Sequence, residues 1–281
     1  MTAFLLKGRT VRGVSVPCFF YGTAWKEERT AELTRLALEA GFTAIDTANQ
    51  RRHYFEAGVG EAVAAFIAEG RSQREDLFLQ TKFTYVRGQD HRLPYDPAAP
   101  PAEQVQQSFL SSLEHLRTSY LDSYVLHGPS GPYGLSAVDW EVWRTMEALQ
   151  REGKTKLIGV SNVSLEQLAA LQREADIAPA FVQNRCFASD GWDREVRAFC
   201  AANDIVYQGF SLLTANLREL SRPEIKRIAE RIGRTLPQVV FRFALQVGMI
   251  PLTGTSNAQH MREDLEIFEL SDEDVRTIEH A

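Results

Sequence analysis

Three ionisable residues stand at or near the carboxyl ends of apolar, strand-like segments in this chain. Asp46, Lys82 and His127 each follow a run of mostly apolar residues, in segments 43–48, 77–82 and 122–127. Burying an ionisable side chain is costly unless the group is paired or functional. In a parallel α/β barrel, the carboxyl ends of the strands form the rim that holds the active site. The three residues therefore predict one shared active site.

These residue types can carry out proton transfer to a carbonyl group. A lysine and an aspartate in a dry pocket fix each other's charge, and a lysine close to a tyrosine lowers the phenol's pKa from about 10. Such a tyrosine can act as a general acid, and a histidine can orient the substrate oxygen. Each residue alone also fits a structural role, but their equivalent positions on three strands favour catalysis.

Eight strand-like segments alternate with amphipathic helical segments and must position these residues. This alternation is typical of an α/β fold, the (β/α)8 TIM barrel, as one domain over residues 1–281. A Rossmann fold would place G-x-G-x-x-G after its first strand, and that motif is absent there. We also expect an N-terminal β-hairpin (4–9 and 12–16) and extra C-terminal helices. The predicted strands are 16–23, 43–48, 77–83, 121–127, 156–162, 180–187, 205–211 and 249–255.

The composition excludes several other classes of protein. The chain has 281 residues, 44% of them hydrophobic, and a formal net charge of −6, which disfavours nucleic-acid binding. Its three cysteines lack the paired spacing of a disulfide framework or zinc site. No signal-peptide core or membrane-length apolar run is visible. We therefore expect a cytoplasmic protein, monomeric by default, without a metal, nucleic acid or membrane as partner.

Four motifs of the chain resemble the aldo-keto reductase family. Residues 41–48 are similar to the family's strand-two signature, and Thr81-Lys82 is similar to its strand-three lysine. Residues 122–127 resemble its strand-four histidine segment, and residues 153–162 are similar to its most recognisable block. The resemblance covers nearly the whole chain. It implies reduction of a small-molecule carbonyl with a nicotinamide cofactor lying across the barrel mouth.

The resemblance also implies which residues contact the cofactor. Ser161, Asn162 and Gln183 would bind the carboxamide, and Phe210 stands where the family usually stacks a tyrosine on the nicotinamide ring. Gly22 and Thr23 match a pair on strand one near the cofactor. The remaining matches to the family's cofactor site are Asp46, Ser211, Leu213, Thr253, Gly254, Thr255, His260 and Asp264.

The position of the catalytic tyrosine departs from the family pattern. In the family it follows the strand-two aspartate by five positions, which here is Arg51. Counting back from the matching helix start gives His53 instead. Tyr54 is adjacent and is the only tyrosine in residues 49–58. We predict Tyr54 as the proton donor with Asp46, Lys82 and His127, His53 as the second choice, and absence of a donor as a third possibility.

Two further departures concern the cofactor phosphate and the pocket. Leu252 occupies the position of a lysine that many members place at the 2′-phosphate, and His260 the position of an arginine. Losing a fixed cation weakens discrimination against NADH. Because most members of the family prefer NADPH, we expect NADPH as the cofactor, with NADH possible.

The chain ends at Ala281 without the family's long C-terminal loop, which predicts an open pocket. Its predicted walls are Trp25, Arg51, His53 and Phe83, with Arg51 either gripping an anionic substrate or solvated.

The predicted function is NAD(P)H-dependent reduction of an aldehyde or ketone to an alcohol, with tyrosine as general acid. The alternative is a nicotinamide-nucleotide-binding regulatory protein on the same scaffold, with little or no catalysis, because a fold alone does not guarantee activity. Retention of Asp46, Lys82 and His127 together argues for the enzyme. The displaced tyrosine is the one feature that favours the alternative.

Overall fold

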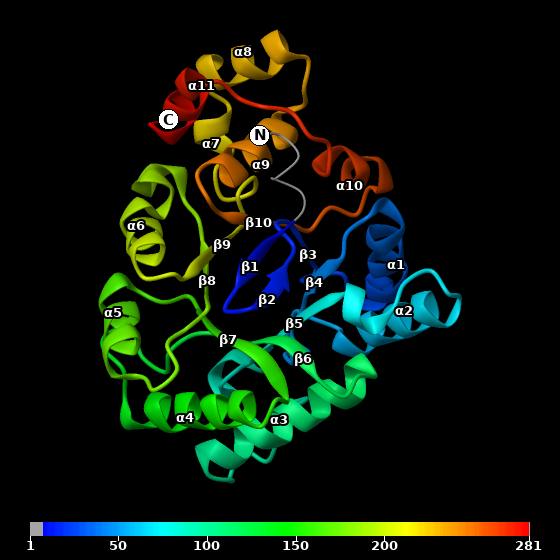
Figure 1. The fold of residues 1–281 in the computed structure, drawn as a ribbon, viewed down its shortest axis with the longest axis vertical. Coiled ribbons are helices and arrows are strands. Elements are labelled where there is room, and N and C mark those ends of the chain that lie inside the picture. The colour runs from blue at the N-terminus through cyan, green and yellow to red at the C-terminus, as the bar shows by residue number, and fades with distance from the viewer. Residues whose placement is uncertain (1–7, 281) are drawn as a thin grey trace.

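The computed structural model describes residues 8–280 and contains a closed barrel of eight parallel strands. Neighbouring strands pair in the order β10-β3-β4-β5-β6-β7-β8-β9, and β10 closes the barrel on β3. Figure 1 shows the helices as a ring around this barrel. The strands are β3 (Phe20–Gly22), β4 (Ala44–Asp46), β5 (Phe78–Phe83), β6 (Leu121–Leu126), β7 (Thr155–Ser161), β8 (Phe181–Arg185), β9 (Val206–Phe210) and β10 (Ile250–Thr253). The predicted (β/α)8 barrel is confirmed.

The helices begin and end where local sequence signals place them. The hydroxyl oxygen of Ser164 accepts a hydrogen bond from the backbone N–H of Gln167, and the Oε1 of Gln167 accepts one from the backbone N–H of Ser164. This pair is the capping box that opens α5. Gly41 ends α1 at φ 112°, a left-handed conformation that favours glycine. The helices are α1 (Thr30–Ala40), α2 (Glu56–Ala68), α3 (Pro101–Leu116), α4 (Ala137–Arg151), α5 (Leu165–Glu174), α6 (Arg194–Ala202), α7 (Leu217–Leu220), α8 (Pro223–Ile232), α9 (Leu236–Gln246), α10 (Ala258–Asp264) and α11 (Asp272–Glu279).

A short antiparallel hairpin covers the amino-terminal end of the barrel. It comprises β1 (Arg9–Val11) and β2 (Val14–Val16) and lies over the barrel centre in Figure 1. Its Val11 and Val16 join a buried cluster with residues that begin barrel strands, such as Phe20 and Phe78. The predicted hairpin is therefore confirmed, although residues 4–7 of its first arm lie outside the described residues. It closes the end of the barrel opposite to Asp46.

Alternation along the strands divides their side chains between two environments. On β5, the side chains of Phe78, Gln80 and Lys82 face the barrel interior, because successive side chains of a strand point to opposite faces. Leu79 and Phe83 face the helices, within the large cluster that fills the space between barrel and helices. The interior is thus apolar near the hairpin and becomes polar toward the carboxyl ends of the strands.

Candidate active site

The carboxyl ends of the barrel strands open into one large cavity. Its volume is about 1540 Å³. Loops after β4, β5 and β6 form one wall, as expected for an open pocket shaped by these loops. All eight barrel strands contribute a residue at or directly after their carboxyl end, and these are Gly22, Asp46, Thr84, His127, Ser161, Arg185, Phe210 and Thr253. This is the face on which (β/α)8 enzymes carry their active sites.

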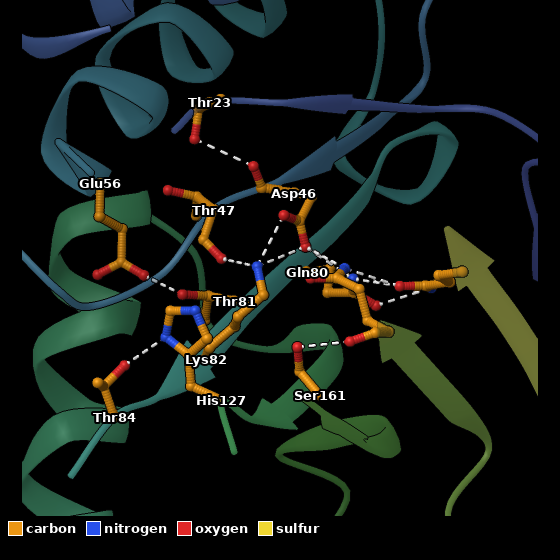
Figure 2. Close-up of polar contacts among 12 residues, drawn as sticks. Thr23, Asp46, Thr47, Glu56, Gln80, Thr81, Lys82, Thr84, His127 and Ser161 are labelled. Atoms are coloured by element: carbon orange, nitrogen blue, oxygen red, sulfur yellow. Dashed lines mark hydrogen bonds and ion pairs between the residues drawn. The ribbon is translucent and has the colours of Figure 1, made fainter. Parts of the chain in front are cut away.

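A buried ion pair joins β4 to β5 at the floor of this cavity. The Nζ of Lys82 lies 2.7 Å from each carboxylate oxygen of Asp46 and 2.8 Å from the carbonyl oxygen of Thr47 (Figure 2). These three acceptors match the three N–H donors of an ammonium group. Burial lowers the pKa of Lys82, and the Asp46 carboxylate opposes that shift. The sequence prediction that these two residues pair is confirmed.

Tyr54 lies close to both Lys82 and His127. The loop after β4 folds back at Gln50, whose carbonyl oxygen accepts from the backbone amides of His53 (3.2 Å) and Tyr54 (3.0 Å). The Tyr54 ring centroid lies 5.3 Å from the Nζ of Lys82 and 5.9 Å from the His127 ring centroid. Tyr54 also lines the cavity. The loop therefore brings the displaced tyrosine to the other three predicted residues.

His53 points toward a different neighbour. Its ring stacks on Trp25 with 4.0 Å between centroids, and Trp25 is 69% exposed at the cavity rim. Both residues line the cavity, as predicted for pocket walls. Of the two candidates for the proton donor, Tyr54 is the one with ring contacts to Lys82 and His127.

The Tyr54 phenol is less acidic than the sequence analysis predicts. Burial, and secondly the Asp46 carboxylate, raise the pKa of Tyr54 well above its usual value. We had expected the Lys82 charge to lower this pKa, and that expectation is wrong. The reason is that Asp46 pairs with Lys82 at 2.7 Å, so the net charge beside the phenol is close to zero and burial decides the direction. Tyr54 is therefore protonated at neutral pH.

His127 is held as a neutral imidazole. Its Nδ1 lies 2.7 Å from the Oγ1 of Thr84, and burial followed by the charge of Lys82 lowers the pKa of His127 to about 3. When the Thr84 hydroxyl donates to Nδ1, the ring proton resides on Nε2. His127 can then donate a hydrogen bond from Nε2 without carrying charge. Thr84 was not among the predicted residues, although it stands only two positions after Lys82.

Ser161, Asn162 and Gln183 form a connected polar group that adjoins His127 and Asp46. Asn162 donates from Nδ2 to the His127 carbonyl oxygen at 2.8 Å, and Ser161 donates to the Gln183 carbonyl oxygen at 2.6 Å. Asn162 has φ 51°, a conformation uncommon outside glycine, and such strain is often found at functional sites. Phe210 lies beside them in the cavity wall. The structure thus brings together the four residues predicted at the nicotinamide.

The other end of the cavity collects the residues predicted near the rest of the cofactor. Thr253 donates to Asp264 at 2.8 Å, and burial raises the pKa of Asp264 to about 6. Ser211 has φ 57°, a second strained position in the wall. The predicted residues that line this end are Gly22, Ser211, Leu213, Thr253, Gly254, Thr255, His260 and Asp264.

Four predicted residues lie outside the cavity lining, and one of them is Lys82, which is fully buried and paired with Asp46. Phe83 is fully buried against Tyr85 and Tyr95, because it follows Lys82 on β5 and points to the opposite face of the strand. Arg51 packs over the Phe55 ring at 4.3 Å. Thr23 is buried and donates its hydroxyl to the Asp46 carbonyl oxygen at 3.0 Å.

Several cavity residues escaped the sequence analysis. Four of them lie between the barrel strands and the helices that follow, where no periodic signal could find them: Lys26, Gln50, Tyr85 and Arg87. The fifth is Arg185, the last residue of β8. Arg87 donates a hydrogen bond to the carbonyl oxygen of Pro129, which also lines the cavity. Across residues 8–280, no group of three His, Cys, Asp or Glu side chains could hold a metal ion. In the same part of the chain, no helix has the length and hydropathy to cross a membrane.

Comparison with known proteins decides the family. The model of the aldo/keto reductase family matches residues 20–281. The chain belongs to the aldo/keto reductase family. This membership confirms the predicted family and the prediction of an NAD(P)H-dependent oxidoreductase.

Named aldo-keto reductase relatives match over nearly the full chain. An uncharacterized oxidoreductase of Bacillus subtilis, YtbE, is 31% identical over 99% of this chain and 94% of its own length. The glyoxal reductase of the same organism is 30% identical over 95% of this chain and 89% of its own. The glycerol 2-dehydrogenase (NADP(+)) of Hypocrea jecorina is 30% identical over 96% of this chain and 89% of its own.

Solved aldo-keto reductase structures share the fold. An aldo/keto reductase from Brucella melitensis superposes with a TM-score of 0.81 at 27% identity, over 98% of this chain and 97% of that one. An aldo-keto reductase complexed with NADPH superposes with a TM-score of 0.82 at 25% identity, over 98% of this chain and 87% of that one.

Proposed function

We propose that this chain reduces an aldehyde or ketone to an alcohol with NADPH, using Tyr54 as the general acid. The observation that carries the proposal is the position of the Tyr54 ring, 5.3 Å from the Nζ of Lys82 and 5.9 Å from the His127 ring at the cavity floor. A protonated phenol, a neutral imidazole and a lysine whose charge is balanced by Asp46 suit a site that protonates a carbonyl oxygen. As part of the same proposal, the enzyme acts as a cytoplasmic monomer on a small molecule.

The cavity residues fit a nicotinamide nucleotide. Asn162 and Gln183 present amide groups, which suit a carboxamide, and Phe210 presents an aromatic face beside them. The Nε2 of Gln183 is engaged by Asp46 at 3.0 Å, which leaves its Oε1 as the acceptor for a carboxamide N–H. When bound, the reduced nicotinamide supplies a hydride to the substrate carbonyl carbon.

The remaining steps belong to side chains of this chain. His127, neutral and hydrogen-bonded to Thr84, donates from Nε2 to the carbonyl oxygen and orients it. Tyr54 transfers its hydroxyl proton to that oxygen as negative charge develops there, so that the product is an alcohol. Lys82 balances the charge of Asp46, so that the negative charge left on Tyr54 does not face an unpaired carboxylate. The high proton affinity of Tyr54 favours reduction over oxidation, because oxidation requires the phenolate.

The proposal of NADPH as the preferred cofactor is supported more by relatives than by the residues of this cavity. One solved neighbour is complexed with NADPH and one relative is named for NADP(+). In this chain, the cavity end near Thr253 carries Leu252, His260 and the carboxyl group of Asp264. An ionised carboxylate repels a 2′-phosphate. We therefore propose NADPH as the preferred cofactor with a small margin over NADH.

Replacing Asp264 with asparagine should increase the preference for NADPH at pH 8. The pKa of Asp264 is about 6, so its carboxylate is charged at pH 8 and neutral at pH 5. Without the repulsion between this carboxylate and the 2′-phosphate, the Kd for NADPH at pH 8 should fall about 5-fold, the equivalent of about 1 kcal/mol. The Kd for NADH should stay nearly unchanged. At pH 5 the variant and the wild type should agree. Glu263→Gln on the same helix is the control, and equal effects on both nucleotides would contradict the prediction.

Reduction should be insensitive to pH over a wide range. Above the His127 pKa of about 3 the imidazole is neutral, and the raised pKa of Tyr54 keeps its phenol protonated into alkaline solution. With saturating nucleotide, kcat/KM for reduction should therefore stay flat from about pH 5 to about pH 9. Oxidation of the alcohol should speed up as pH rises, since it needs the phenolate. A fall in kcat/KM for reduction as the pH rises from 6 to 7 would indicate a histidine proton donor instead.

Nucleotide binding is the first test of this function. NADPH and NADH are titrated separately into the purified protein, and the quenching of tryptophan fluorescence is recorded. Trp25 lies at the cavity rim and reports occupancy. We expect saturable quenching by both nucleotides, with NADPH the tighter. Absence of binding by either nucleotide would refute the proposed function.

A further inference from the structure

Three buried glutamines form a polar layer inside the barrel directly beneath Asp46. Gln80 comes from β5, Gln183 from β8 and Gln208 from β9. Their side chains are buried, with exposures of 0%, 3% and 0%. Amides in a barrel interior carry a desolvation cost that apolar side chains of the same size would avoid. The need to fill the barrel interior therefore does not explain why these three side chains are glutamines.

The glutamines are bonded to one another and to Asp46. Asp46 Oδ1 accepts from the Nε2 of Gln80 at 2.8 Å, in addition to Lys82 (Figure 2). It also accepts from the Nε2 of Gln183 at 3.0 Å. The Oε1 of Gln208 accepts from the same two nitrogens at 2.8 and 2.9 Å. The Nε2 of Gln208 donates to the Oε1 of Gln80 at 3.1 Å. Each glutamine thus holds the orientation of another.

The chemistry of the carboxylate fixes which way each amide points. An ionised carboxylate only accepts hydrogen bonds, so Gln80 and Gln183 must both turn their NH₂ groups toward Asp46. Gln208 then has to turn its oxygen toward these two NH₂ groups. As a result, the Oε1 of Gln183 is directed away from the layer, and Gln183 lines the cavity.

We propose that Gln80 and Gln208 are positioning residues that hold the amide of Gln183 with its oxygen turned toward the carboxamide of the nicotinamide. The proposal rests on the proposed function, since it assigns a bound nicotinamide to this cavity. Neither Gln80 nor Gln208 lines the cavity itself, so both act through Gln183 and Asp46. The layer also couples the carboxamide site to the Asp46–Lys82 pair, because one oxygen of Asp46 takes part in both.

The test compares a nucleotide that contains nicotinamide with one that lacks it. Gln208→Met keeps the side-chain volume, removes the three hydrogen bonds of the Gln208 amide, and leaves the hydrogen bonds of Asp46 in place. We expect the Kd for NADPH to rise about 3- to 10-fold, the usual worth of one hydrogen bond. The Kd for 2′-phospho-ADP-ribose, which has no nicotinamide, should stay unchanged. NADH and ADP-ribose replace this pair if NADH binds more tightly.

Two further variants keep the test decisive. Gln208→Asn retains an amide but withdraws it by one methylene, and it carries the same prediction if Gln208→Met does not fold. Gln246→Met is the control: the Gln246 amide makes two hydrogen bonds to the backbone of Leu270 and lies outside the cavity. It should alter neither Kd.

The possible outcomes separate the two proposals. A rise in the NADPH Kd alone supports the positioning role. Equal rises for both ligands would show general structural damage, and no rise for either would show that Gln183 needs no support; both results overturn the inference but leave the proposed function standing. If the wild-type protein binds neither ligand, the proposed function fails, and the positioning role fails with it.

Discussion

Replacing Tyr54 with phenylalanine should lower kcat/KM for carbonyl reduction by about 10²- to 10⁴-fold, the usual range for loss of a general acid. The phenylalanine ring keeps the contacts with Lys82 and His127 at 5.3 and 5.9 Å but has no proton to give. Nucleotide affinity should stay within a factor of about two, since the hydroxyl is not part of the carboxamide site. Stopped-flow kinetics and the fluorescence titration measure the two quantities.

Two control variants make this result interpretable. Tyr85→Phe removes the hydroxyl of another cavity tyrosine, which is bonded to Asp139 at 2.9 Å, and should retain most of the activity. His53→Asn tests the second candidate, whose ring stacks on Trp25. If His53→Asn abolished turnover while Tyr54→Phe preserved it, the assignment of the proton donor would be reversed. If both variants kept full activity, the site would work without either residue.

Replacing Lys82 with methionine should have the largest effect on stability. The variant leaves the Asp46 carboxylate buried at 2% exposure without its cationic partner. Breaking a buried ion pair from one side costs about 3 to 5 kcal/mol of unfolding free energy. Activity should fall as well, because the unpaired Asp46 carboxylate would oppose the negative charge left on Tyr54. Chemical denaturation monitored by circular dichroism measures the loss.

The double variant Asp46→Asn with Lys82→Met tests whether the unpaired carboxylate causes both losses. It removes both charges, so most of the lost unfolding free energy and part of the lost activity should return. Arg29→Met, which breaks an exposed pair with Glu32, is the control and should change stability little. A Lys82→Met variant as stable as the wild type would contradict the account of this ion pair.

The fold was predictable because its signals repeat. Each barrel strand gave a short apolar run, and all eight predicted segments overlap β3 to β10. Because the carboxyl ends of parallel strands meet at one rim, the positions of Asp46 and Lys82 on their strands were enough to predict that they meet. His127 required the same reasoning, and its ring lies 5.9 Å from the Tyr54 ring.

The loops were less predictable, because a loop has no period. The sequence left the donor open among Tyr54, His53 and no donor, and the turn at Gln50 decides which ring meets Lys82. Phe83 was a different kind of error: Lys82 faces the barrel interior, so alternation required Phe83 to face the helices. The same alternation from Lys82 would have placed Gln80 inside the barrel, a signal that was present but not used.

The acidity of Tyr54 depended on two quantities that the sequence does not contain. One is the burial of the phenol, and the other is the 2.7 Å pairing that neutralises Lys82. Residue types alone predicted a lowered pKa, whereas the arrangement raises it. In the proposed reaction, such a phenol is suited to giving a proton to the substrate.

Transfer of the hydride is the most direct test of the central claim. NADPH carrying deuterium at the transferable position of its nicotinamide is mixed with the protein and a panel of small aldehydes and ketones. The absorbance of the reduced ring is followed, and the product is examined by mass spectrometry. The account predicts loss of absorbance that depends on the carbonyl compound, with one deuterium on the product's carbinol carbon and a much slower reaction in Tyr54→Phe. Tight NADPH binding with no deuterated alcohol from any compound in the panel would contradict it.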